Sequence, residues 1–214
     1  VTALAARQVL IAGSMDGKIS SLPITIRPKP KQDIAPKILG NFHSGQVTGM
    51  AVLSGLPALI SCSSDGTLRT WDYTSDVASA TPFGEFGSSF TALCCSPLSN
   101  AIAVGSSRGV LRVFAVVATP KQPVLFYRAR VHRGSITRLA FHPNQLFLAA
   151  VCEGGRLYLL DTVTPQYKLF GFIDLGAVIT DIAWNIANVE SQLFVTLAGG
   201  SVYRLAVPEK RQPQ

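Results

Sequence analysis

The chain has 214 residues, of which 48% are hydrophobic and 14% are charged, and its formal net charge is +7. This hydrophobic content is ample for a folded core and excludes an intrinsically disordered chain. No apolar run exceeds about half of the roughly 20 residues that a transmembrane helix needs, so we expect no membrane partner.

The charged fraction of 14% is low, because an average soluble domain carries about 25%. We therefore expect part of the surface to meet a partner. The basic residues gather in two segments, Ile26–Lys37 and Tyr127–Arg138. Such clusters can attract nucleic acid, anionic lipid or acidic protein segments, although solvated loops and charged edge strands that discourage aggregation are the simpler explanation. The candidate partner-binding residues are Arg27, Lys29, Lys31, Lys37, Arg128, Arg130 and Arg133.

Cysteine usage bears on the compartment. The four cysteines, Cys62, Cys94, Cys95 and Cys152, show neither CxxC spacing nor the density of a disulfide scaffold. We predict that they are small buried apolar residues, which indicates a reducing compartment.

A short phrase with threonine in its second position recurs along the chain. It reads VTAL at Val1, VTGM at Val47, FTAL at Phe90, ITRL at Ile136 and ITDI at Ile179. A short apolar run and then a glycine follow each copy, and these glycines are Gly17, Gly66, Gly109, Gly155 and Gly200. The glycines recur every 43 to 49 residues, a period typical of solenoids and propellers.

In each period, one strand-like run precedes the glycine and another follows it. The runs before the glycines read VLIAG, ALISC, AIAVG, LFLAA and LFVTL. Glycine suits the tight hairpin between them because it accepts a positive φ, and no segment shows sustained helical periodicity. We therefore predict an all-β chain of small antiparallel sheets that must stack on one another, with repeats over residues 1–40, 41–86, 87–130, 131–175 and 176–214 of a single domain.

Twisted four-stranded sheets stacked around an axis form a β-propeller, and a Trp-Asp pair at the end of the third strand is typical of its WD-repeat form. The pair Trp71-Asp72 is intact. The four other copies read Leu22-Pro23, Phe114-Ala115, Leu160-Asp161 and Leu205-Ala206. The chain thus resembles a WD-repeat protein over nearly its whole length, with degenerate repeats.

The resemblance implies a WD-repeat β-propeller. Rings of this family usually close with seven blades, whereas this chain supplies about five. We expect segments outside the chain to complete a seven-blade ring, with a closed five-blade ring as the alternative. The insertion Pro23–Lys37 lengthens the link between the first two blades, and it is predicted as an exposed contact arm or a plain linker.

Four side chains of the second repeat match a structural feature of the family. In WD repeats, a His before the first strand, a Ser or Thr in the second, the Asp of the tight turn and the Trp of the third form a hydrogen-bonded brace. His43, Ser61, Asp65 and Trp71 occupy those positions, so the resemblance implies that they form a structural brace.

A Ser-His-Asp hydrolase is the sharper alternative for the same side chains. Such a site needs an oxyanion hole and a strained nucleophile turn, and Ser61 is predicted in mid-strand without either. Three histidines on separate loops and the lack of any nucleotide-binding glycine pattern give no metal or cofactor motif. We predict no enzyme, with no catalytic, cofactor-binding or metal-binding residues and no cofactor.

The fourth repeat keeps a histidine, His132, at the brace position. It has Gly154 and Leu160 where the Asp and the Trp belong. We therefore predict that its brace is broken and that His132 faces solvent.

The segments FHSGQVTGMAVLSGLPALISCSSDGTLRTWDY and GSITRLAFHPNQLFLAAVCEGGRLYLLD, with FGFIDLGAVITDIAW after them, are similar to the degenerate repeats of large cilia- and flagella-associated WD-repeat proteins. This resemblance implies a scaffold for protein interaction in the motile axoneme, where such proteins tether dynein machinery to doublet microtubules. The expected partners are axonemal subunits, dynein or tubulin, and the expected location is cytoplasmic and cytoskeletal, in the axoneme. The cluster of Arg128, Arg130 and Arg133 would then face acidic tubulin or an acidic subunit.

The alternative is a WD-repeat subunit of an RNA-processing or chromatin complex that binds nucleic acid or acidic partners through its basic loops. The two basic segments motivate it. Nucleic acid is the less expected partner, because few aromatic stacking platforms lie beside them.

Overall fold

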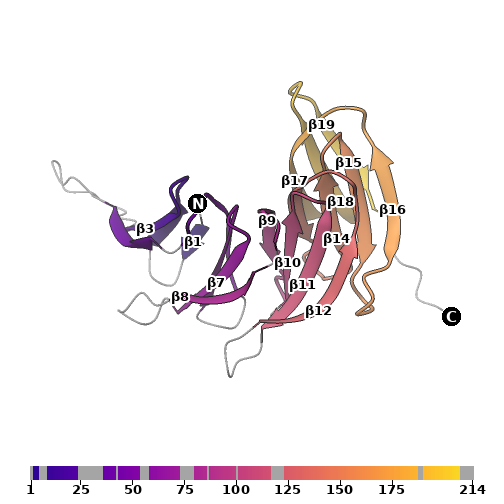
Figure 1. Ribbon diagram of the computed structural model, residues 1–214. Helices are drawn as coiled ribbons and strands as arrows, with labels where there is room; N and C mark the ends of the chain where they lie inside the picture. Colours follow the sequence, from indigo (N-terminus) through magenta and orange to yellow (C-terminus); the bar gives the residue numbers. More distant parts are fainter. Residues whose placement is uncertain are drawn as a thin grey trace.

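The computed structural model describes residues 2–4, 9–23, 36–41, 43–53, 58–72, 80–85, 87–99, 101–116, 123–187 and 190–207 (Figure 1). These residues form strands β1 to β19 and contain no helix. The predicted all-β class is therefore confirmed. The strands make five antiparallel sheets that follow one another in chain order, and we number the sheets in that order.

In the first two sheets, the order of strands in space equals their order in the chain. The first contains β1 (Thr2–Leu4), β2 (Val9–Gly13), β3 (Lys18–Pro23) and β4 (Lys37–Asn41). The second contains β5 (Val47–Val52), β6 (Ala58–Ser63), β7 (Thr67–Asp72) and β8 (Ala80–Glu85). Of the predicted insertion, residues 24–35 lie outside the described residues.

The other three sheets repeat this order. The third contains β9 (Phe90–Cys95), β10 (Ala101–Ser106), β11 (Val110–Val116) and β12 (Pro123–Arg130). The fourth contains β13 (Ile136–Phe141), β14 (Phe147–Cys152), β15 (Arg156–Asp161) and β16 (Leu169–Asp174). The fifth contains β17 (Ile179–Ala187), β18 (Glu190–Leu197) and β19 (Val202–Ala206).

The hydrophobic core lies between successive sheets. Strand β14 shows why: Leu148 and Ala150 pack toward the third sheet, whereas Ala149 and Val151 pack toward the fifth, since successive side chains of a strand point to opposite faces. All six residues of β14 and all six of β6 are buried. Sheets covered on both faces need such continuous apolar runs, which accounts for the ALISC and LFLAA segments.

The first strands of successive sheets lie beside one another. Strand β9 contacts both β5 and β13, and β13 contacts β17. Figure 1 shows the sheets fanned one behind the next from β1 to β19. This arrangement matches consecutive blades of a propeller, while closure into a ring of five or seven blades stays a prediction.

The recurrent glycines occupy the hairpin between the second and third strands of each sheet. Gly17, Gly66, Gly109, Gly155 and Gly200 all have positive φ, between 69° and 85°. At Gly109, a Cβ would also lie 2.0 Å from the carbonyl oxygen of His132. Only glycine fits this turn, because the chain that leaves β12 passes directly over it.

None of the described residues belongs to a helix that is long and apolar enough to cross a membrane.

Candidate functional site

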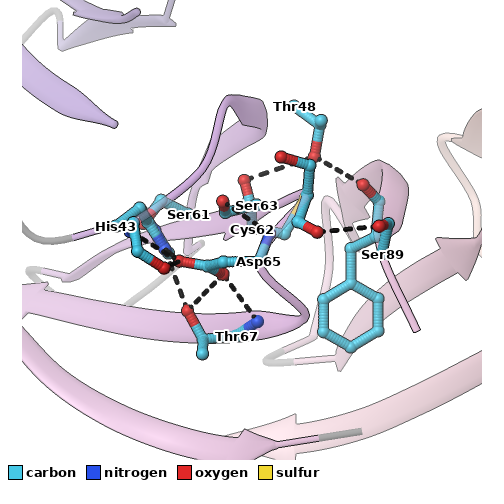
Figure 2. A network of polar contacts seen from close by, with 11 residues as sticks. His43, Thr48, Ser61, Cys62, Ser63, Asp65, Thr67 and Ser89 are labelled. Atoms are coloured by element: carbon cyan, nitrogen blue, oxygen red, sulfur yellow. Dashed lines mark hydrogen bonds and ion pairs between the residues drawn. The ribbon is translucent and has the colours of Figure 1, made fainter. Parts of the chain in front are cut away.

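The second sheet holds a cluster of buried polar side chains around His43, which precedes β5 (Figure 2). The His43 Nε2 lies 2.8 Å from the Oγ of Ser61, in the middle of β6. Its Nδ1 lies 3.2 Å from the Oδ2 of Asp65, in the turn between β6 and β7. The structure thus brings three of the four predicted brace residues together.

The fourth predicted brace residue is Trp71. Its backbone lies in β7, where it pairs with Leu59 of β6 and Ala80 of β8. Its side chain lies outside the described part of the structure, so its place in the brace stays a prediction.

Asp65 is the hub of this cluster. Its Oδ1 accepts hydrogen bonds from the backbone N–H of Thr67 at 2.8 Å and from the Thr67 hydroxyl at 2.7 Å. Its Oδ2 accepts a bond from the backbone N–H of Ser44 at 2.9 Å as well as from His43. Asp65 therefore ties the loop before β5 to the hairpin. Sequence reasoning missed Thr67, although a Thr directly after an Asp-Gly pair, two residues after the Asp, is the available signal.

The cluster shifts two pKa values downward. Burial lowers the pKa of His43 and outweighs the opposing influence of the Asp65 carboxylate. For Asp65, burial alone would raise the pKa, but the bonds from Thr67 and Ser44, together with His43, lower it to about 2. At neutral pH the aspartate is ionised and the histidine is neutral. The Nδ1–H is then shared between the Asp65 carboxylate at 3.2 Å and the Thr67 hydroxyl oxygen at 3.0 Å, and Nε2 accepts from Ser61.

Ser61 contacts His43 and His43 contacts Asp65, which is the order of a Ser-His-Asp hydrolytic triad. The side chains of Ser61 and His43, however, are buried as deeply as those of core residues. Ser61 is 0% exposed and His43 is 3% exposed. A nucleophile must meet a substrate carbonyl, and the Ser61 hydroxyl is covered by the sheets packed around β6. In this arrangement the cluster joins a loop to a sheet.

Two of the recurrent threonines link neighbouring sheets, whereas the Thr137 hydroxyl bonds to the carbonyl of Val151 in its own sheet at 3.4 Å. The Thr48 hydroxyl is 2.9 Å from the carbonyl oxygen of Phe90 in the next sheet (Figure 2) and 3.3 Å from that of Cys62 in its own sheet. The Thr91 hydroxyl repeats the pattern with Ile136 of the fourth sheet at 2.5 Å and Gly105 at 3.3 Å. Each of these two threonines therefore links its sheet to the residue that precedes the next threonine. The sequence showed that these threonines recur, but it did not predict that they link neighbouring sheets.

The fourth repeat differs from its prediction. His132 is half-buried rather than solvent-facing, because its ring lies 6.1 Å from the ring of Tyr158. Its Nδ1 accepts a bond from the backbone N–H of Gly134 at 3.0 Å. The neighbouring Glu153 carboxylate accepts a bond from the Ser135 N–H at 3.3 Å, as Asp65 does from Ser44.

A second buried histidine joins the fourth and fifth sheets and was not predicted as a contact. The His142 Nε2 lies 2.7 Å from the hydroxyl of Ser191. Its ring meets the indole of Trp184 edge-on at 4.8 Å, and the indole N–H donates to the carbonyl of Ala140 at 3.1 Å. Burial lowers the pKa of His142.

The four cysteines are free. Cys62 and Cys152 are buried, whereas Cys94 and Cys95 keep partial exposure. Burial raises the pKa of Cys62, Cys95 and Cys152 to about 12 and raises that of Cys94 well above its ordinary value. The thiols therefore behave as small apolar groups at neutral pH.

The predicted partner-binding residues fall into two groups. Arg27, Lys29 and Lys31 lie outside the described residues, and Lys37 begins β4 with an exposed side chain. Arg128 and Arg130 are exposed on β12, and Arg133 is exposed just after it. Arg128 and Arg130 line a shallow hollow of about 560 Å³ together with Arg108, a residue not singled out from the sequence. Arg133 does not line it.

Comparison with known proteins agrees with this geometry. The family described as "WD domain, G-beta repeat" matches residues 37–72 and 123–161. Each matched segment starts with the outer strand of one sheet, β4 or β12, and ends with the third strand of the next, β7 or β15. The sequence repeat is thus offset from the sheet by one strand, so each repeat joins two neighbouring sheets covalently.

Three curated relatives are similar to parts of the chain. WD repeat-containing protein 90 of Xenopus tropicalis is 33% identical over 48% of this chain. Cilia- and flagella-associated protein 43 of Chlamydomonas reinhardtii is 29% identical over 68%, and cilia- and flagella-associated protein 44 of Mus musculus is 24% identical over 81%. The chain spans 5%, 9% and 10% of the lengths of these three proteins.

A solved structure supports the fold. The crystal structure of Saccharomyces cerevisiae Sqt1 superposes with a TM-score of 0.74 at 17% identity, over 92% of this chain and 55% of that one. Five stacked antiparallel sheets with two matched repeats define a β-propeller segment. The chain therefore contains WD40 repeats, and it is similar to WD-repeat proteins.

Proposed function

We propose that this chain is part of a non-catalytic WD-repeat scaffold for protein interaction in a large assembly, and that the assembly is the axoneme of motile cilia or flagella. The observation that carries the axonemal part is the similarity to two proteins whose names are cilia- and flagella-associated, at 29% and 24% identity.

The arrangement of polar residues supports the scaffold part. The side chains that resemble a catalytic set, Ser61 and His43, are buried within the fold. Several of the charged and large apolar side chains that face outward lie on outer strands, such as Arg128 on β12 and Phe172 on β16. A rigid stack of sheets with such outer strands suits contact with other proteins.

The proposed partners are neighbouring axonemal subunits, dynein or tubulin, and the proposed location is the cytoskeleton of the cilium. Arg128, Arg130 and Arg133 are the candidate contacts because their guanidinium groups suit the carboxylates of an acidic subunit.

Fractionation of isolated cilia tests the axonemal proposal. The full-length protein that contains this chain is expected to stay with the microtubule fraction after detergent and salt washes. Recovery mainly in a soluble or nuclear fraction would overturn the axonemal assignment. The scaffold proposal would then be tested by crosslinking, which identifies neighbouring proteins in any assembly.

The second candidate function is nucleic-acid binding, favoured by basic residues that no acidic neighbour offsets in the segment between Glu85 and Glu153. Retention of RNA at physiological salt, with a salt dependence that weakens when Lys29 and Lys31 are replaced, is expected for this candidate. Indifference to RNA under these conditions rules it out.

A further inference from the structure

Strand β12 is the outer edge of the third sheet. The sheet order is β12-β11-β10-β9, so one side of β12 pairs with β11 and its other side has no neighbouring strand in the described residues. With eight residues, β12 is longer than the fourth strands of the other sheets, β4, β8 and β16. A long edge strand is a template for pairing with another extended chain.

The side chains of β12 divide into an apolar half and a basic half. In the first half, Val124 is 55% exposed, and Leu125 and Phe126 are each 42% exposed. In the second half, Arg128 and Arg130 are exposed on one face, since they stand two residues apart. We call Val124–Phe126 with Arg128 and Arg130 the β12 strip.

The basic half has no acidic residue near it in the sequence. No Asp or Glu occurs between Glu85 and Glu153, a stretch that contains the whole third sheet. Arg112 lies directly across from Arg128 in the strand pairing, and burial, with a further contribution from Arg128, lowers the pKa of Arg112. Like charges opposite each other destabilise a sheet, so an anionic group at this position would stabilise it.

The hollow beside the strip is formed by Arg108, Val110, Arg128, Ala129 and Arg130. The Arg130 Nε donates to the carbonyl oxygen of Arg108 at 3.3 Å, which holds these two arginines side by side. Among the described residues, none of the ion pairs involves Arg108, Arg128 or Arg130. Their guanidinium groups remain able to bind carboxylates in the bidentate geometry that arginine favours.

We infer that the β12 strip binds an extended acidic segment of a partner protein, which adds a strand to the third sheet. This inference rests on the proposed function as a protein scaffold, but not on its axonemal location. Every strand pairing among the described residues is antiparallel, and the inferred partner strand runs antiparallel to β12 in the same way. Its chain then has two acidic residues separated by one other residue, to match Arg128 and Arg130, followed by apolar residues that meet Val124–Phe126.

Two simpler accounts compete with this inference. Arginines on an edge strand can serve only to prevent aggregation, and a basic hollow can bind nucleic acid without regard to peptide order. Neither account predicts that the position of the acidic residues within a peptide matters.

Binding of synthetic peptides to the full-length protein tests the inference. The probe is an eight-residue peptide, matched to the length of β12, with Glu-Thr-Glu followed by alternating Val and Thr. It is expected to bind at physiological salt. A Gln-for-Glu peptide and a peptide of reversed order are expected to bind about tenfold more weakly, as for loss of a charge-assisted contact. Backbone N-methylation of the probe is expected to abolish binding, because it removes strand pairing.

Two matched arginine variants test whether the peptide binds at the β12 strip. Arg128→Ser is expected to weaken binding about tenfold, whereas Arg204→Ser, which changes an exposed arginine on the edge strand β19, leaves it unchanged. Equal thermal melting of the two variants shows that both are folded. Failure of the probe to bind, equal binding by the two variants, or binding of an RNA oligonucleotide in place of the peptide overturns the inference. In that case, crosslinks between neighbouring proteins and surfaces other than the β12 strip would still support the scaffold proposal. The absence of such crosslinks would contradict it.

Discussion

At the scale of single residues, the cluster around His43 is held together by complete pairing of its polar atoms. Each oxygen of Asp65 accepts at least two hydrogen bonds, and both nitrogens of His43 have partners. Buried polar groups stabilise a fold when each one is satisfied, and they destabilise it strongly when one is left without a partner. The cluster therefore makes the loop before β5 and the β6–β7 hairpin depend on each other.

Replacement of Asp65 tests this dependence. Asp65→Asn places an amide NH₂ where one carboxylate oxygen now accepts two donors, so the free energy of unfolding is expected to fall by about 1–3 kcal/mol. Chemical denaturation measures the change. Asp174→Asn is the control, because Asp174 pairs with Arg156 at the surface, and its loss is expected to stay below about 1 kcal/mol. Equal losses in the two variants would show that Asp65 is no hub.

The stability of the protein is expected to fall as the pH drops below about 6.5, the ordinary pKa of histidine. The folded pKa of His43 lies below that value. Between the two pKa values the unfolded chain binds a proton that folded His43 does not, so acidification favours unfolding. His142 shifts in the same direction.

The measurement is the free energy of unfolding at about pH 7.5 and pH 5.5 for the natural protein and for His43→Gln. The decrease on acidification is expected to be smaller in the variant, because one of the two contributing histidines has been removed. The same decrease in both proteins contradicts the assignment to His43.

Residue-level features were predictable where a motif has fixed spacing. His43, Ser61 and Asp65 were found by their resemblance to a family pattern, and they do meet in space. Thr67 was missed because a threonine two residues after an aspartate is common in any turn. The partial burial of His132 depends on Tyr158, a contact across the sheet that local sequence does not encode.

At the scale of elements, neighbouring sheets are joined by their first strands. The hydroxyls of Thr48 and Thr91 bond to the carbonyl of the residue that precedes the next recurrent threonine, Phe90 and Ile136 respectively. Thr180 has the same place in the fifth sheet, where its described bonds stay within that sheet. At Thr48 and Thr91, the recurrence in sequence thus reflects a contact between sheets.

Replacement of the recurrent threonines distinguishes the two situations. Thr91→Val keeps the shape of the side chain but removes the bond to Ile136, so the free energy of unfolding is expected to fall by about 1 kcal/mol. Thr180→Val removes only bonds at an exposed position and is expected to cost less. Urea denaturation of both variants measures the difference, and a larger loss for Thr180→Val would refute the role of the inter-sheet bond.

Strands and turns were predictable because their signals are local. Apolar runs such as ALISC and LFLAA became the fully buried strands β6 and β14, and the recurrent glycines sit in turns with positive φ. The contacts of His142 with Ser191 and Trp184 were not predictable, since these residues are more than 40 positions apart in the sequence. Whether they meet depends on the angle at which the fourth and fifth sheets pack. The open edge of β12 likewise follows from sheet order and not from its own sequence.

At the scale of the whole molecule, the core is shared between sheets and not enclosed within any one of them. Each sheet is too thin to bury both faces by itself, so stability comes from the contact of each sheet with the next, as in other repeat architectures. The third sheet combines this internal support with an outer strand whose basic residues face solvent. This combination of a shared core and open outer edges favours a scaffold that holds partners along its rim.

The most direct test of this account is a cryo-EM structure of the full-length protein in its native assembly. The account predicts β5, β9 and β13 side by side, the Thr48 and Thr91 hydroxyls bonded to the following sheet, and every recurrent glycine in the same kind of turn. A map with substantial helix in residues 2–207, or with Gly66, Gly109 and Gly155 in unrelated surroundings, would contradict it.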